Sequence, residues 1–162
     1  MGVNEAHERH DYVEEKIEWF IARCKAHGMK ITPQRIAIYR ELVCTDEHPS
    51  AEAIYRKIKS YYPNVSLTTI YRTLETFDKL GLVSTVGNTL SHAARYDANL
   101  TPHTHLVCVV CRKIEDLYDE TLSNLNLEDK TDYRVLGYSL IINGVCRDCQ
   151  QEGASRKAEK GS

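Results

Sequence analysis

The sequence lacks any long hydrophobic run, and no apolar stretch approaches the roughly 20 residues that a transmembrane helix needs. It also lacks a signal peptide, because residues 1–15 are polar and acidic. These absences lead us to expect a cytoplasmic protein with no membrane partner. A disordered chain is excluded as well, since 42% of the residues are hydrophobic and 27% are charged. A globular chain of 162 residues has room for one ordinary domain or two small ones.

An excess of basic charge is also missing, because the formal net charge is -2. This total argues weakly against a nucleic-acid partner, whose phosphates attract Lys and Arg. The distribution points the other way, since residues 23–40 contain five Lys or Arg residues and no acidic ones. One basic face on an otherwise balanced protein is therefore compatible with the composition.

Apolar residues recur at helical spacing through the first part of the chain. A first helix is predicted to end near Gly28. A second is predicted to begin at Thr32, whose hydroxyl can cap it and which is followed by a proline. Ser50 is expected to begin a third helix, and Ser66 a fourth.

The predicted fourth helix is followed by residues 82–97, which have β-like composition around a turn at residues 87–88. Helix, turn, helix and β-hairpin is the order of a winged helix-turn-helix, which lays its second helix in the DNA major groove. The outward face of that helix carries groups able to reach bases or phosphates: Thr68, Thr69, Tyr71, Arg72 and Thr76. The pattern alone also fits a small helical domain whose polar face is only solvated.

The character of the chain changes near residue 98, and the predicted fold class is α+β. We predict a winged-helix domain over residues 1–98, a hinge over 99–102, a small α/β domain over 103–150 and a disordered tail over 151–162. The second domain is expected to have strands near residues 106–110, 113–117 and 133–143, and a helix over about 120–127.

Two pairs of cysteines carry the strongest chemical signal. Two residues separate Cys108 from Cys111, and two separate Cys146 from Cys149. Each pair can present two thiolates to one ion, and together they complete the tetrahedral four-sulfur site that Zn²⁺ prefers. Such a site has no open position, so its role would be structural. The alternative is a set of redox dithiols or disulfides, although structural disulfides are rare in the cytosol.

A second candidate metal site begins at His103 and His105. Residues one apart on an extended chain point the same way, so both imidazoles can face one ion. Candidate partners are Asp97, Asp116 and, from a loop in the first domain, His48. Three imidazoles and two carboxylates suit Fe²⁺, Mn²⁺ or Zn²⁺, and an ion held by both domains would clamp them together. The alternatives are a solvated hinge with an ordinary surface histidine, or the open iron site of a small metalloenzyme.

Taken together, these segments resemble the ferric uptake regulator (Fur) family from about residue 28 to residue 149. The matching segments are GMKITPQR (28–35), HPSAEAIY (48–55), SLTTIYRTL (66–74), RYD (95–97), HTH (103–105), KIED (113–116) and the two CxxC pairs. The resemblance implies a transcriptional repressor, not an enzyme, that binds an inverted-repeat operator in double-stranded DNA when its regulatory site holds metal. It also implies a homodimer, with residues 103–150 as the dimerisation domain and structural zinc at the four cysteines.

The same resemblance implies that Tyr71 and Arg72 lie at the DNA and that Arg35 lies near its backbone. One departure is Lys30, which stands where the family usually has arginine. Lysine keeps the charge but loses the two-pronged guanidinium geometry.

Within the family, the residues resemble the peroxide-stress repressors. Their regulatory site holds three His and two Asp, which His48, Asp97, His103, His105 and Asp116 match one for one. Iron sensors usually carry Glu at the position of Asp116 and commonly another His in the strand before the last CxxC pair, whereas residues 133–144 contain no His.

The implied mechanism is reduction of hydrogen peroxide by bound Fe²⁺, followed by oxidation of His48 or His103 and release of DNA. Mn²⁺ in the same regulatory site would resist peroxide. The alternative is a repressor of the same family that responds to the level of iron or another metal without sensing peroxide.

Overall fold

The structure is a computed structural model that describes residues 3–86, 94–123, 125–127, 130–135 and 138–152. The chain divides into two compact units. The N-terminal unit comprises residues 3–86 and 94–100, and the C-terminal unit comprises the described residues from 101 to 152. Within these described ranges, no helix combines the length and the apolar character needed to cross a membrane.

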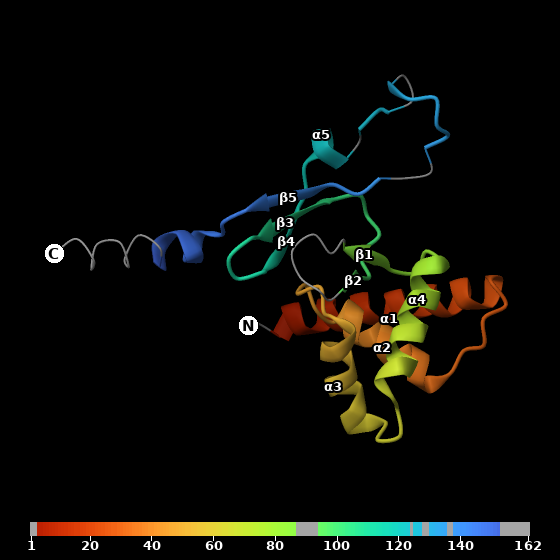
Figure 1. The fold of residues 1–162 in the computed structure, drawn as a ribbon. Coiled ribbons are helices and arrows are strands. Elements are labelled where there is room, and N and C mark those ends of the chain that lie inside the picture. The colour runs from red at the N-terminus through yellow and green to blue at the C-terminus, as the bar shows by residue number, and fades with distance from the viewer. Residues whose placement is uncertain (1–2, 87–93, 124, 128–129, 136–137, 153–162) are drawn as a thin grey trace. The chain divides into compact units, whose positions relative to one another are not determined.

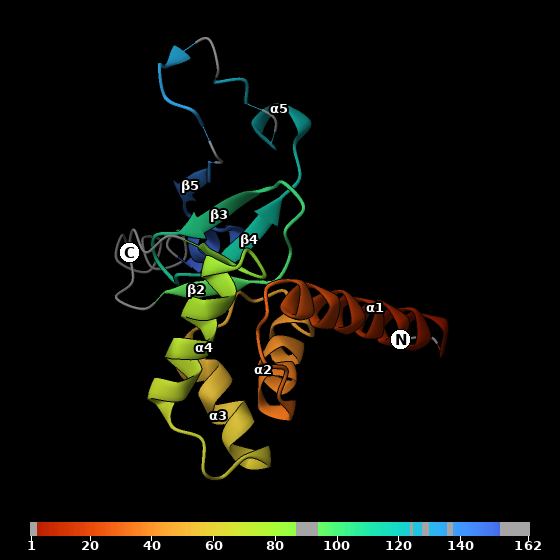
Figure 2. The same cartoon turned by 90° about the vertical axis from the view of Figure 1, so that its right-hand side faces the viewer.

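Helices dominate the N-terminal unit (Figure 1). Its elements are α1 (Val3–Ala26), α2 (Pro33–Val43), α3 (Ala51–Tyr61), α4 (Leu67–Lys79), β1 (Ser84–Val86) and β2 (Arg95–Asp97). Helices α3 and α4 pack side by side in Figures 1 and 2, and the antiparallel β1–β2 pair follows them in the chain. This is the predicted order of a winged helix-turn-helix. The predicted turn at residues 87–88 lies outside the described residues.

Hydroxyl side chains begin three of these helices. The side-chain oxygens of Thr32, Ser50 and Ser66 each accept a hydrogen bond from the backbone N–H three residues further on. Each cap satisfies a donor that the helix itself cannot pair, which typically contributes about 1 kcal/mol. The predicted starts of α2, α3 and α4 are therefore confirmed.

The core of the N-terminal unit gathers the apolar faces of its four helices. The Phe20 ring stacks on Tyr39 at a centroid distance of 4.2 Å and meets Phe77 edge-on at 5.0 Å. All three side chains are buried, and burial of a large apolar side chain contributes about 1.5–3 kcal/mol. This packing fixes α4 against α1 and α2 and leaves the other face of α4 exposed.

A three-stranded sheet organises the C-terminal unit. Its elements are β3 (Thr104–Cys108), β4 (Ile114–Leu117), the short α5 (Glu120–Ser123) and β5 (Ile141–Gly144). Strand β3 is central: it pairs antiparallel with β4 and parallel with β5. Residues 147–152 are helical. The two units together confirm the predicted α+β fold class, a winged helix-turn-helix followed by a small α/β unit.

Two predicted elements differ from the structure. The strand predicted over residues 133–143 is wrong for most of its length, because only Ile141–Gly144 is strand among the described residues. Tyr133 and Val135 are exposed there, and β-propensity acts only where a neighbouring strand offers a surface to pack on. Of the described residues in the helix predicted over 120–127, only Glu120–Ser123 are helical. The tail predicted to be disordered begins too early, because residues 151 and 152 are helical, and residues 153–162 lie outside the described residues.

Candidate functional site

The four late cysteines meet at one end of the C-terminal sheet. Cys108 ends β3, Cys111 follows it, and Cys146 and Cys149 come after β5. Because β3 and β5 are parallel, with Cys108 opposite Gly144, both pairs arrive at the same end. All four Sγ atoms lie within 4.8 Å of one another, and those of Cys111 and Cys146 are 3.7 Å apart. Sulfurs bound to one tetrahedral zinc at about 2.3 Å lie about 3.8 Å apart, whereas a disulfide needs about 2.05 Å.

The thiols of this cluster differ in how readily they ionise. Backbone N–H groups of Cys146 and Cys111 lower the pKa of the Cys108 thiol to about 6, and the Cys146 nitrogen lies 3.3 Å from Cys108 Sγ. In contrast, its hydrogen bond with Cys146 and its desolvation raise the pKa of Cys149 to about 12. The protein groups alone thus favour ionisation of one thiol and oppose it at another. A bound cation would favour the thiolate form of all four, which fits the predicted structural zinc.

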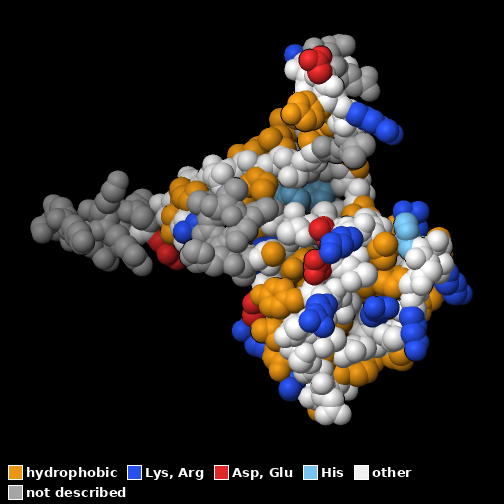
Figure 3. All heavy atoms as spheres, turned by 45° about the vertical axis from the view of Figure 1, so that its right-hand side comes forward, with side chains coloured by type: hydrophobic (Ala, Val, Ile, Leu, Met, Phe, Trp, Pro, Cys, Tyr) orange, Lys and Arg blue, Asp and Glu red, His pale blue; other side chains and the backbone are white. Residues whose placement is uncertain are grey.

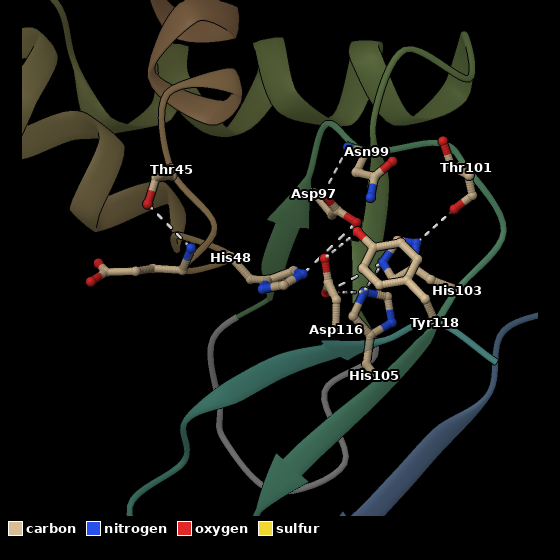
Figure 4. Close-up of polar contacts among 10 residues, drawn as sticks. Thr45, His48, Asp97, Asn99, Thr101, His103, His105, Asp116 and Tyr118 are labelled. Atoms are coloured by element: carbon tan, nitrogen blue, oxygen red, sulfur yellow. Dashed lines mark hydrogen bonds and ion pairs between the residues drawn. The ribbon is translucent and has the colours of Figure 1, made fainter. Parts of the chain in front are cut away.

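Two imidazoles and one carboxylate converge elsewhere in the C-terminal unit (Figure 4). His103 precedes β3, while His105 lies on β3 directly opposite Asp116 on β4. The Nε2 atom of His103 lies 3.0 Å from Nε2 of His105 and 3.4 Å from Oδ1 of Asp116. The same Oδ1 lies 3.8 Å from Nε2 of His105.

These separations are close to those within one coordination sphere. Two ligand atoms about 2.1 Å from an ion, at right or tetrahedral angles, lie about 3.0–3.4 Å apart. Non-haem Fe²⁺ sites typically have this arrangement, in which two imidazoles and one carboxylate bind one face of the ion and the other positions are open. We refer to His103, His105 and Asp116 as the C-terminal triad.

A backbone carbonyl sets the tautomer of His103. Its Nδ1 lies 2.6 Å from the carbonyl oxygen of Thr101. A carbonyl can only accept, so Nδ1 carries the proton of the neutral ring and Nε2 keeps its lone pair. Metal-binding histidines are commonly oriented in this way through the second ring nitrogen. The role of this carbonyl was not visible in the sequence.

In the N-terminal unit, His48 and Asp97 form a smaller donor set. His48 Nε2 lies 3.8 Å from Asp97 Oδ2, while Asp97 Oδ1 accepts a hydrogen bond of 2.7 Å from the backbone N–H of Asn99. The Tyr96 N–H donates to the Pro49 carbonyl at 3.1 Å and so joins the histidine loop to β2. His48 has φ 49°, which costs a non-glycine residue about 1–2 kcal/mol. Backbone strain of this kind is concentrated at functional sites.

The exposed face of α4 carries most of the residues predicted to contact DNA. Thr68, Tyr71 and Arg72 are exposed there. The hydroxyl of Thr69 lies 2.8 Å from Ser66 Oγ, so it also supports the helix cap. Figure 3 shows Lys and Arg side chains spread over one face of this unit.

Two contacts in this region were not predicted. The Tyr71 hydroxyl donates a hydrogen bond to the Glu52 carboxylate on α3, which lowers the pKa of Glu52 and raises that of Tyr71. Arg35 on α2 donates to the carbonyl of Lys30 at 2.5 Å. The first contact ties together the two helices of the helix-turn-helix and orients the tyrosine.

Comparison with known proteins gives the chain its family. The family described as Ferric uptake regulator family matches residues 26–143. The chain is 49% identical over 130 residues to the transcriptional regulator PerR of Clostridium acetobutylicum, covering 79% of this chain and 94% of that protein. It is 36% identical over 145 residues to the peroxide-responsive repressor PerR of Staphylococcus epidermidis, covering 87% and 95%.

Solved structures agree. The Helicobacter pylori regulator Fur, described as having three functional metal-binding sites, matches with a TM-score of 0.69 at 26% identity, covering 85% of this chain and 93% of that one. PerR from Streptococcus pyogenes matches with a TM-score of 0.50 at 32% identity, covering 83% and 92%. These relatives are regulators and not enzymes, which decides against a metalloenzyme. The chain therefore belongs to the ferric uptake regulator family and resembles its PerR branch.

Proposed function

We propose that this protein is a metal-dependent transcriptional repressor that senses peroxide through oxidation of its own regulatory site. The observation that carries the proposal is the C-terminal triad, whose three ligand atoms stand 3.0–3.8 Å apart. Three ligands on one face leave coordination positions through which a small oxidant can reach the ion. The two PerR relatives, one of them named as peroxide-responsive, support peroxide as the signal.

His48 and Asp97 would complete the regulatory site with the triad. The resulting three imidazoles and two carboxylates suit Fe²⁺ or Mn²⁺. Each unit supplies ligands that the other lacks, so the free energy of metal binding would couple the two units to each other. Loss of any one ligand would weaken that coupling and with it the form of the protein that binds DNA.

Ferrous iron bound at this site would activate hydrogen peroxide close to the ligating imidazoles. The ring of His48 or His103 would then gain one oxygen atom from the peroxide, and the other oxygen atom would leave as water. An oxidised ring is a poorer ligand, so the N-terminal and C-terminal ligands would no longer hold the two units in the DNA-binding arrangement. Protein loaded with Mn²⁺ would keep its histidines intact and stay on DNA.

The proposed DNA surface lies around α4. Thr68, Thr69, Tyr71 and Arg72 present hydroxyl and guanidinium groups that can bond to base edges and phosphates, and Arg35 would contact the backbone. In a homodimer, two such helices would read an inverted repeat, because the symmetry of the operator mirrors that of the protein. Structural zinc at the four cysteines would hold β3 and β5 together in each protomer.

Mass spectrometry of the metal-loaded protein tests the proposal. Full-length protein loaded with Fe²⁺ receives a brief low dose of hydrogen peroxide, and protein loaded with Mn²⁺ serves as the control. We expect one added oxygen on the peptide that carries His48 or His103, only with iron and together with loss of DNA binding. Unmodified histidines with DNA binding intact would instead support a repressor of this family that responds to metal level alone.

A further inference from the structure

Tyr118 lies beside the C-terminal triad but is not one of its ligands. It follows Asp116 by two residues and comes directly after the end of β4. Its hydroxyl donates a hydrogen bond of 3.2 Å to Oδ2 of Asp116, and its ring lies 5.6 Å from the His103 ring. Figure 4 shows Asp116 next to both this tyrosine and the two imidazoles of the triad.

The two oxygens of Asp116 therefore have different partners. Oδ1 faces Nε2 of both histidines at 3.4 and 3.8 Å, while Oδ2 accepts from the Tyr118 hydroxyl. A carboxylate can bind an ion through one oxygen or through both, and a hydrogen bond to one oxygen favours binding through the other. We infer that Tyr118 is a positioning residue that restricts Asp116 to binding the regulatory metal through Oδ1. This inference rests on the proposed function.

The number of oxygens that Asp116 contributes decides how many positions remain for water or peroxide. Binding through Oδ1 alone leaves one more open position than binding through both oxygens. Removal of the Tyr118 hydroxyl would allow Oδ2 to turn to the ion, which would strengthen metal binding and close that position. A tyrosine that merely stabilised the ligand would have the opposite effect, because loss of such a contact typically weakens metal binding by about 10–100-fold. The direction of the change in affinity thus separates the two roles.

The substitution Tyr118→Phe tests this inference in the full-length protein. Tyr118 is 62% exposed, and phenylalanine keeps the ring beside His103, so the change removes only the hydroxyl. Titration with Mn²⁺ measures affinity, and water-proton relaxation measures the number of waters on the bound ion. We expect a higher affinity than that of the wild type and the loss of about one bound water. With Fe²⁺, mass spectrometry should show histidine oxidation slowed about tenfold.

Tyr133→Phe is the matched control, because Tyr133 lies in the same unit and is 83% exposed. It should behave as the wild type in all three measurements. If the Tyr118→Phe variant binds Mn²⁺ with the same number of waters as the wild type, and with unchanged or lowered affinity, the inference is overturned. The proposed function would still stand. If the wild type binds Mn²⁺ no more tightly than the His103→Ala variant does, the proposed function is overturned, and this inference falls with it.

Discussion

The hydrogen bond between Tyr71 and Glu52 leads to a prediction about how the helix-turn-helix is held together. Tyr71 lies on the exposed face of α4, and Glu52 lies in the first turn of α3. A hydrogen bond to a charged group contributes about 1.5–3 kcal/mol where water is excluded. Tyr71 is 38% exposed, so solvent screens the pair, and we expect a contribution of about 0.5–1.5 kcal/mol.

A double-mutant cycle measures this contribution directly. The free energy of unfolding in urea is determined for the wild type, Tyr71→Phe, Glu52→Ala and the double variant. Effects of the glutamate on helix propensity and on the helix dipole occur in both arms of the cycle and cancel. A coupling energy below about 0.3 kcal/mol, which is the usual departure from additivity between independent sites, would refute the reasoning.

The coupling should also depend on pH in a defined direction. The hydrogen bond from Tyr71 is the main cause that lowers the pKa of Glu52 below its ordinary value of 4.5. A carboxyl group whose pKa is lower in the folded protein than in the unfolded chain stabilises the fold when it is ionised. This contribution is complete at pH values above the pKa of the unfolded chain, and it is lost as the pH falls through the pKa of the folded protein. The coupling should therefore be constant near neutral pH and disappear at strongly acidic pH. Its persistence there would show that the bond does not need the ionised carboxylate.

Three further predictions concern single side chains. Thr32→Ala removes the N-cap of α2 and should lower the free energy of unfolding by about 1 kcal/mol, whereas Thr32→Ser should not; an equal loss in both would contradict the capping role. Tyr39→Phe removes a buried hydroxyl that has no hydrogen-bond partner among the residues the structure describes, and should raise the free energy of unfolding by about 1 kcal/mol at neutral pH. Burial raises the pKa of Tyr39, so this gain should grow above about pH 10, where the tyrosine ionises in the unfolded chain but not in the folded one; alkaline stability curves that run parallel for both proteins would count against it. Cys149→Ser should abolish stoichiometric zinc binding, measured by elemental analysis, and should also weaken Mn²⁺ binding at the regulatory site; a variant that retained both would overturn the structural role of the cluster.

The features that sequence reasoning predicted correctly depend on short stretches of chain. The caps at Thr32, Ser50 and Ser66 each join a hydroxyl to a backbone N–H three residues away, so local sequence is enough to predict them. The pairing of His103 with His105 follows from the alternation of side chains along an extended segment, and their rings are 4.5 Å apart.

Contacts between distant elements were not predictable in the same way. The Tyr71–Glu52 bond depends on how α3 packs against α4, which residue spacing does not specify. The strand predicted over residues 133–143 failed because strand formation needs a neighbour that the local sequence does not reveal. The contact between Tyr118 and Asp116 was not predicted either, although only two residues separate them along the chain.

Strand β3 connects the two metal sites of the C-terminal unit. It begins beside His103, carries His105 and ends at Cys108. Its partner β4 holds Asp116 opposite His105, and its partner β5 leads to the second cysteine pair. Zinc at the cysteines would hold β3 to β5, and structural zinc ions bind small domains with about 10–16 kcal/mol, which is comparable to the whole stability of a typical domain. Loss of zinc should therefore disturb the register that sets the triad, whereas loss of the regulatory metal should leave the cysteine cluster intact.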